Sequence, residues 1–131
     1  MAKGAAKGIA YEHEVAEILS LWVSSGGQPN IYRRHPKSGT DGVEGDITWN
    51  FDTGKWLVEN FVIEVKYYKD LDSQFWSFFS GESSNFFINT FRQVVATSNA
   101  TERSWIAWIK ANNRKPILFT DSKAIYDLSR H

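Results

Sequence analysis

Residues 60–69, NFVIEVKYYK, constrain the fold of this chain more than any other stretch. The run is apolar enough for a central strand, yet Glu64 and Lys66 lie two residues apart within it. Alternate side chains of a strand share one face, so Glu64 and Lys66 would lie roughly 7 Å apart on one face. Burying two charged groups is costly unless something pairs with them. We expect Val62, Glu64, Lys66 and Tyr68 on that face, and Phe61, Ile63, Val65 and Tyr67 on the other.

A second acid interrupts an apolar run upstream. In GDITW, residues 45–49, Asp46 opens what reads as another strand. Carboxylates on two neighbouring strands, together with a lysine, are the minimum for holding a hard divalent cation beside a phosphate. The same residues could instead form an ion pair between Glu64 and Lys66, which is worth little if it is exposed.

Residues 9–24 have the periodicity of an amphipathic helix. The apolar stripe consists of Tyr11, Val15, Ile18, Leu19 and Trp22. At roughly 100° per residue, Glu12 projects about 20° from Leu19. Glu12 therefore leans over whatever the helix packs on, or else it compensates the helix dipole in the first turn.

Residues 31–35 read as a short strand that ends in basic residues. The cluster consists of Arg33, Arg34, His35 and Lys37, and it is either a solvated charge run or a phosphate-binding surface. The glycine-rich loop 38–45 follows, in which Ser38 could contact phosphate or stabilise a turn. The loop is not a P-loop, since no GK[ST] follows it.

The remaining pattern predicts one layered domain over residues 1–131. We expect strands at 46–51, 61–67, 104–110 and 116–120, a turn at 52–55, and helices at 85–97 and 121–129. Residues 56–60 could continue the next strand, and the aromatic stretch 70–84 has no clear assignment. This order predicts an α/β or α+β domain with a central mixed five-stranded sheet flanked by helices.

Composition excludes several classes of protein. The formal charge is zero and the estimated pI is 6.8, which argues against an indiscriminate polyanion binder. The absence of cysteine excludes disulfides and thiolate metal sites. We find no apolar run long enough for a bilayer and no signal peptide, so we expect a cytoplasmic protein without membrane contact. Trp105 and Trp108 could form a dimer seam or fill the core.

The motifs GD at 45–46 and EVK at 64–66 resemble those of the PD-(D/E)XK nuclease superfamily, which has the restriction-endonuclease-like fold. The chain is most similar to archaeal-type Holliday junction resolvases and related small phage nucleases. The similar stretches are KGIAYEHEVAEIL, RRHPKSGT, GDITWN, FVIEVKYYK, FFINTFRQVVAT and SWIAWIKANNRKPILFT, and they cover residues 7 to 120.

This resemblance implies a metal-dependent endodeoxyribonuclease. Asp46, Glu64 and the Val65 carbonyl would hold Mg²⁺, for which Mn²⁺ can substitute. Lys66 would orient the attacking water or neutralise the phosphate, and Glu12 would bind a second metal or a metal-bound water. The expected DNA contacts are Arg33, Arg34, Lys37, Ser38, Lys69, Gln93 and Lys110.

The resemblance further implies a homodimer that acts on branched or duplex DNA in recombination, repair or replication, in the host cytoplasm if the protein is phage-encoded. Two alternatives stay open. One is a catalytically inactive nucleic-acid-binding module of the same fold. The other is an unrelated α/β interaction domain whose ion pairs mimic the motif.

Overall fold

The structure, a computed structural model, describes residues 2–36, 45–70, 80, 86–121 and 123. The chain forms an α+β domain of helices and short strands. Its elements are α1 (Ala2–Val23), β1 (Tyr32–Arg34), β2 (Ile47–Trp49), the 3₁₀ helix η1 (Asp52–Gly54), α2 (Lys55–Asn60), β3 (Phe61–Tyr68), α4 (Phe86–Thr101), β4 (Ser104–Ala111) and β5 (Ile117–Thr120). None of the helices in these ranges is long and apolar enough to span a membrane.

The five predicted strands are present, and one of the two sheets they form is mixed. β3 pairs with β4 in parallel, and β4 pairs with β5 antiparallel. β1 and β2 form a separate antiparallel ribbon. The single five-stranded sheet expected from the sequence is therefore divided into three strands and two.

The division has a local cause at Asp46. Its backbone N–H donates to the Ile63 carbonyl at 2.8 Å, as a neighbouring strand would. The next donor on that edge of β3, the Val65 N–H, binds the Asp46 side chain at 2.7 Å instead of a backbone carbonyl. The ladder stops there because the side chain has taken the place of a backbone partner.

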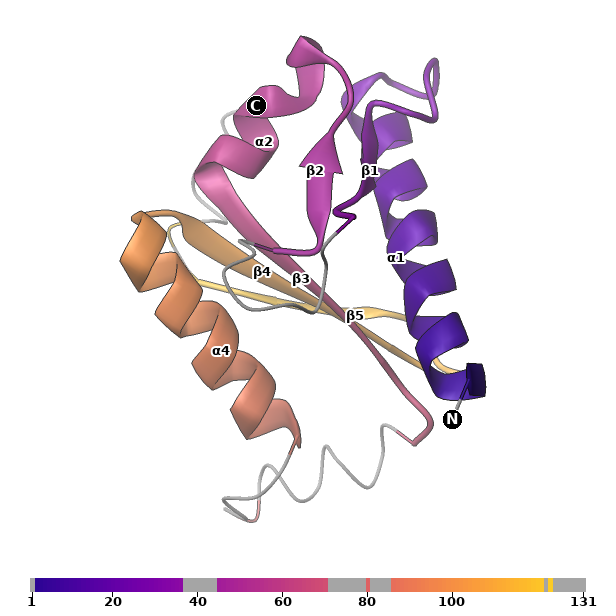
Figure 1. The fold of residues 1–131 in the computed structure, drawn as a ribbon, viewed down its shortest axis with the longest axis vertical. Helices are drawn as coiled ribbons and strands as arrows, with labels where there is room; N and C mark the ends of the chain where they lie inside the picture. The colour runs from indigo at the N-terminus through magenta and orange to yellow at the C-terminus, as the bar shows by residue number, and fades with distance from the viewer. Residues whose placement is uncertain (1, 37–44, 71–79, 81–85, 122, 124–131) are drawn as a thin grey trace.

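Helices cover both faces of the three-stranded sheet (Figure 1). α1 packs on β3 from one side, and α4 packs on β3 and β4 from the other. Phe61, Ile63 and Val65 share one core cluster with α1, and Tyr67 packs against it. On the opposite face, the Tyr68 hydroxyl lies 2.9 Å from Thr90 of α4. The alternation predicted for β3 is confirmed.

The apolar stripe predicted for the first helix is buried in the middle of the helix but largely exposed toward its C-terminal end. Tyr11, Val15 and Leu19 are buried, whereas Ile18 and Trp22 are 40% and 51% exposed. The helix also begins earlier, at Ala2. Ile18 and Trp22 line an apolar pocket of about 320 Å³ that also includes Leu118, so the core does not enclose them.

Residues 56–60 continue no strand, because they form α2. Leu57 anchors this short helix in the core with 1% of its surface exposed. α4 extends to Thr101, four residues beyond the predicted end. The expected helix at 121–129 and most of the unassigned stretch 70–84 lie outside the described residues.

Candidate functional site

Gly45 brings Asp46 against the open edge of β3. Its φ of +98° is a conformation that residues with side chains rarely adopt. A Cβ at this position would also lie 3.2 Å from both the nitrogen and the oxygen of Ile63. Gly45 therefore permits a close approach between two backbones.

Three backbone groups hold Asp46. Besides its bonds to Ile63 and Val65, its carbonyl accepts the His35 N–H at 2.7 Å. The residue is only 5% exposed. The carboxylate therefore has a defined position beside β3 before any ligand binds.

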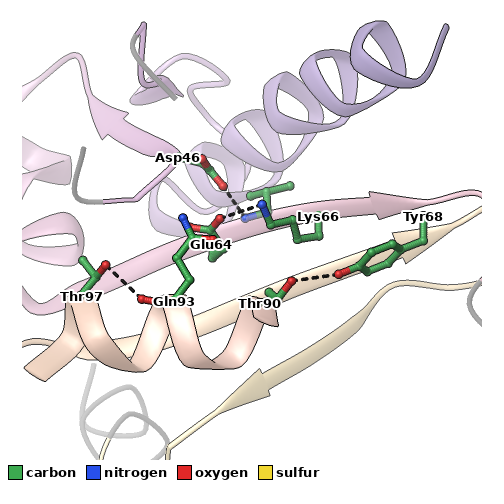
Figure 2. Close-up of polar contacts among 8 residues, drawn as sticks. Asp46, Glu64, Lys66, Tyr68, Thr90, Gln93 and Thr97 are labelled. Atoms are coloured by element: carbon green, nitrogen blue, oxygen red, sulfur yellow. Dashed lines mark hydrogen bonds and ion pairs between the residues drawn. The ribbon is translucent and has the colours of Figure 1, made fainter. Parts of the chain in front are cut away.

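Glu64 and Lys66 share the α4 face of β3, and the Asp46 carboxylate reaches the edge of the same strand (Figure 2). The Lys66 ammonium lies 3.1 Å from the Glu64 carboxylate. Burial and the nearby Asp46 carboxylate raise the pKa of Glu64 to about 7, although Lys66 acts in the opposite direction. Two carboxylates and one ammonium thus meet at one point of the sheet.

Lys66 is held as a cation. Burial by itself would lower the pKa of its ammonium, but the Glu64 and Asp46 carboxylates outweigh this effect and raise the pKa above its ordinary value. Lys66 is consequently protonated at neutral pH. It is suited to binding an anion and not to removing a proton from water.

Glu12 lies near this cluster, but it has a partner that the sequence did not indicate. The Arg34 Nε donates to Glu12 Oε2 at 2.6 Å, and both side chains are largely buried. Among the charges that affect Glu64, Glu12 has the weakest effect. Strand alternation could have revealed the pair, because Arg34 lies opposite the buried Ile47 in the ribbon and so faces inward, whereas Arg33 is exposed.

The predicted DNA contacts fall in different places. Figure 2 shows the Gln93 side chain extending from α4 toward Glu64. Lys69 is exposed just beyond the end of β3. Lys110 lies on the other face of the sheet, 6.0 Å from the Tyr67 ring, and its ammonium donates to the Ala111 carbonyl at 2.7 Å. Lys37 and Ser38 are outside the described residues.

The donors around Asp46 fit a hard divalent cation with two carboxylate ligands. The described residues contain no group of three or more histidines and acids arranged to hold a metal. Asp46 and Glu64 nevertheless repel each other, and a cation between them would relieve that repulsion. The Val65 N–H points to the Asp46 edge, and the carbonyl of the same residue points to the same edge.

Comparisons of the chain with models of protein families, with curated proteins and with solved structures find no match.

Proposed function

We propose that this protein is a Mg²⁺-dependent DNA endonuclease with the restriction-endonuclease-like fold. The observation that carries the proposal is the meeting of Asp46, Glu64 and Lys66 beside one edge of β3. These residues come from two segments separated in the sequence, and they correspond to the D and ExK motifs. Burying such a cluster costs stability, which favours a chemical role over a structural one.

The chemistry follows from the residues present. Asp46, Glu64 and the Val65 carbonyl would hold Mg²⁺, which supplies an acidified water and neutralises phosphate charge when bound. The Lys66 ammonium, whose pKa the two carboxylates raise, would neutralise a phosphate oxygen or orient the attacking water. Glu64 must be ionised to serve as a ligand, so bound cation lowers the pH at which it loses its proton.

The substrate that we propose is structured DNA, as for Holliday junction resolvases, with a homodimer presenting two sites to two strands. Exposed Arg33 and Lys69 would contact the phosphate backbone, and Gln93 would approach it from α4. Such contacts position DNA without reading its sequence. We also propose a cytoplasmic location, which is consistent with this role.

A second candidate function is an inactive DNA-binding module of the same fold. The observation in its favour is that Glu12 pairs with Arg34, which leaves two carboxylates for a cation in the described part of the chain. The two candidates differ in one result, because the module binds DNA and leaves it intact in Mg²⁺.

A cleavage assay tests both functions. Labelled four-way junction, flap, nicked and linear duplex DNA are incubated with the protein in Mg²⁺, Mn²⁺ or EDTA. We expect cleavage with 5′-phosphate ends in metal, no cleavage in EDTA, and none with Asp46→Asn. The matched control is Asp52→Asn, which removes the same charge from an exposed position and should cut normally. Binding without cutting in either metal supports the module, and no binding at low salt contradicts both functions.

A further inference from the structure

We infer that the site takes one divalent cation. Arg34, oriented by Glu12, supplies the positive charge that a second metal ion would otherwise provide, and it contacts the substrate phosphate. This inference rests on the proposed nuclease function. It gives Glu12 a role other than the metal ligation expected from the sequence, and it makes Glu12 a positioning residue.

The geometry of the pair is the first support. Arg34 Nε lies 2.6 Å from Glu12 Oε2, and their side chains are only 20% and 13% exposed. Separating a partly buried ion pair leaves a charge without compensation, which is strongly unfavourable. A cation that recruited Glu12 would compete with Arg34 for the charge of this carboxylate, so Glu12 is a weaker ligand for a second metal than an unpaired acid would be.

The remaining donors of Arg34 are the second support. In the part of the chain that the structure describes, Glu12 is the hydrogen-bonding partner of Arg34, and it uses the Nε position. A guanidinium has five N–H groups in a rigid fork, so the four on its terminal nitrogens remain for an anion. Planar, paired donors of this kind match phosphate oxygens.

Arg34 is also next to the metal ligand in the fold. It is opposite Ile47 in the ribbon, and the adjacent His35 N–H binds the Asp46 carbonyl. Arg34 faces inward from the ribbon, whereas its neighbour Arg33 is exposed. The strand that presents Arg34 is thus fixed to the residue that would bind the cation.

The charges of the site agree with a single cation. Among the residues that the structure describes at this site, Glu12, Asp46 and ionised Glu64 carry three negative charges, and Arg34 and Lys66 carry two positive ones. One divalent cation would bring the site to a net charge of plus one, which a phosphodiester neutralises. A second divalent cation would leave two positive charges without compensation.

Metal stoichiometry tests the first half of the inference. Mn²⁺ binding is followed by electron paramagnetic resonance in wild-type protein and in Glu12→Gln, each with and without four-way junction. We expect one ion per chain in both proteins, an affinity within about twofold, and no bound ion in Asp46→Asn. Two ions per chain, or loss of an ion in Glu12→Gln, would overturn the inference and leave the nuclease function standing. No bound ion together with no cleavage would overturn both.

A double-mutant cycle tests the second half. We expect Arg34→Ala to lower kcat/KM for junction cleavage by about 100-fold, as loss of a transition-state donor does. Glu12→Ala should lower it less, and the double variant should be no worse than Arg34→Ala, because Glu12 acts through Arg34. Glu12→Gln should retain most activity, since its amide oxygen still accepts the Nε hydrogen bond.

The matched control is Arg33→Ala, which removes the same charge one residue away at an exposed position. This variant should change DNA affinity and its salt dependence with little change in kcat. Thermal unfolding of every variant identifies those that fail to fold. Two results would contradict the role assigned to Arg34. One is that the losses of kcat/KM in Glu12→Ala and Arg34→Ala multiply in the double variant. The other is that Arg34→Ala changes the kinetics no more than Arg33→Ala does.

Discussion

The Asp46 carboxylate accepts the backbone N–H of Val65 at 2.7 Å, and this bond ties the edge of β3 to the candidate site. It closes the free edge of β3 with a side chain, so the ribbon of β1 and β2 does not extend the sheet. It also holds Asp46 close enough to Glu64 for the Asp46 carboxylate to raise the pKa of Glu64.

Two substitutions at Asp46 separate its hydrogen bond from its charge. Asp46→Asn keeps an oxygen acceptor for the Val65 N–H, so we expect near wild-type stability and no cleavage. Asp46→Ala leaves that buried N–H without a partner, which costs about 1–3 kcal/mol in the free energy of unfolding. Urea denaturation measures the difference, and equal stability of the two variants would contradict the structural role of the bond.

Glu64→Gln should be more stable than wild type at high pH. The folded-state pKa of Glu64 is about 7, above its ordinary value of 4.5, so the folded protein holds this proton more tightly than the unfolded chain does. Its contribution to stability is fully present below pH 4.5 and is lost as pH rises to 7. Glutamine removes this loss, and above pH 7 the gain is up to about 3 kcal/mol.

The measurement is the free energy of unfolding of wild type and Glu64→Gln from pH 4 to pH 8. Glu17→Gln, a substitution of an exposed acid, is the control and should follow wild type. Mg²⁺ should raise the melting temperature of wild type above pH 7 and should not raise that of Glu64→Gln. Parallel stability curves for wild type and Glu64→Gln would show that Glu64 is not perturbed.

Gly45→Ala should reduce both stability and cleavage. A Cβ would be strained at φ +98° and would press on the backbone of Ile63 at 3.2 Å, so we expect a loss of about 1–3 kcal/mol and a displaced Asp46. Gly8→Ala is the matched control. A Cβ added at this position in α1 would have nothing within 4 Å, and alanine favours a helix. Calorimetry should show Gly8→Ala at or above the wild-type melting temperature, and a similar result for Gly45→Ala would refute the strain.

Gly54→Ala tests packing where backbone conformation plays no part. Gly54 has an ordinary φ of −97°, but a Cβ there would lie 2.4 Å from Ile31 and 2.9 Å from the Tyr32 ring. Overpacking of this kind costs about 1–3 kcal/mol. We expect a lower melting temperature with cleavage retained below it. Cleavage lost from folded protein would mean that Gly54 also supports the site.

Local periodicity accounts for what could be predicted from the sequence. Alternation in residues 61–68 placed Glu64 and Lys66 on one face with Tyr68, and helical spacing placed Tyr11, Val15 and Leu19 in the core. These predictions hold because a strand or helix determines which of its own residues share a face.

The arrangement of distant segments was decided by the tertiary structure. The split into two sheets depends on one side chain that replaces a backbone acceptor, and the pairing of Glu12 with Arg34 depends on how α1 lies against the ribbon. Lys110, expected as a DNA contact, lies on the face of the sheet opposite Glu64 and Lys66, because β4 pairs with β3 in the register that aligns it with Tyr67. Periodicity assigns a residue to a face of its own element, but only packing decides which residues of other elements it meets there.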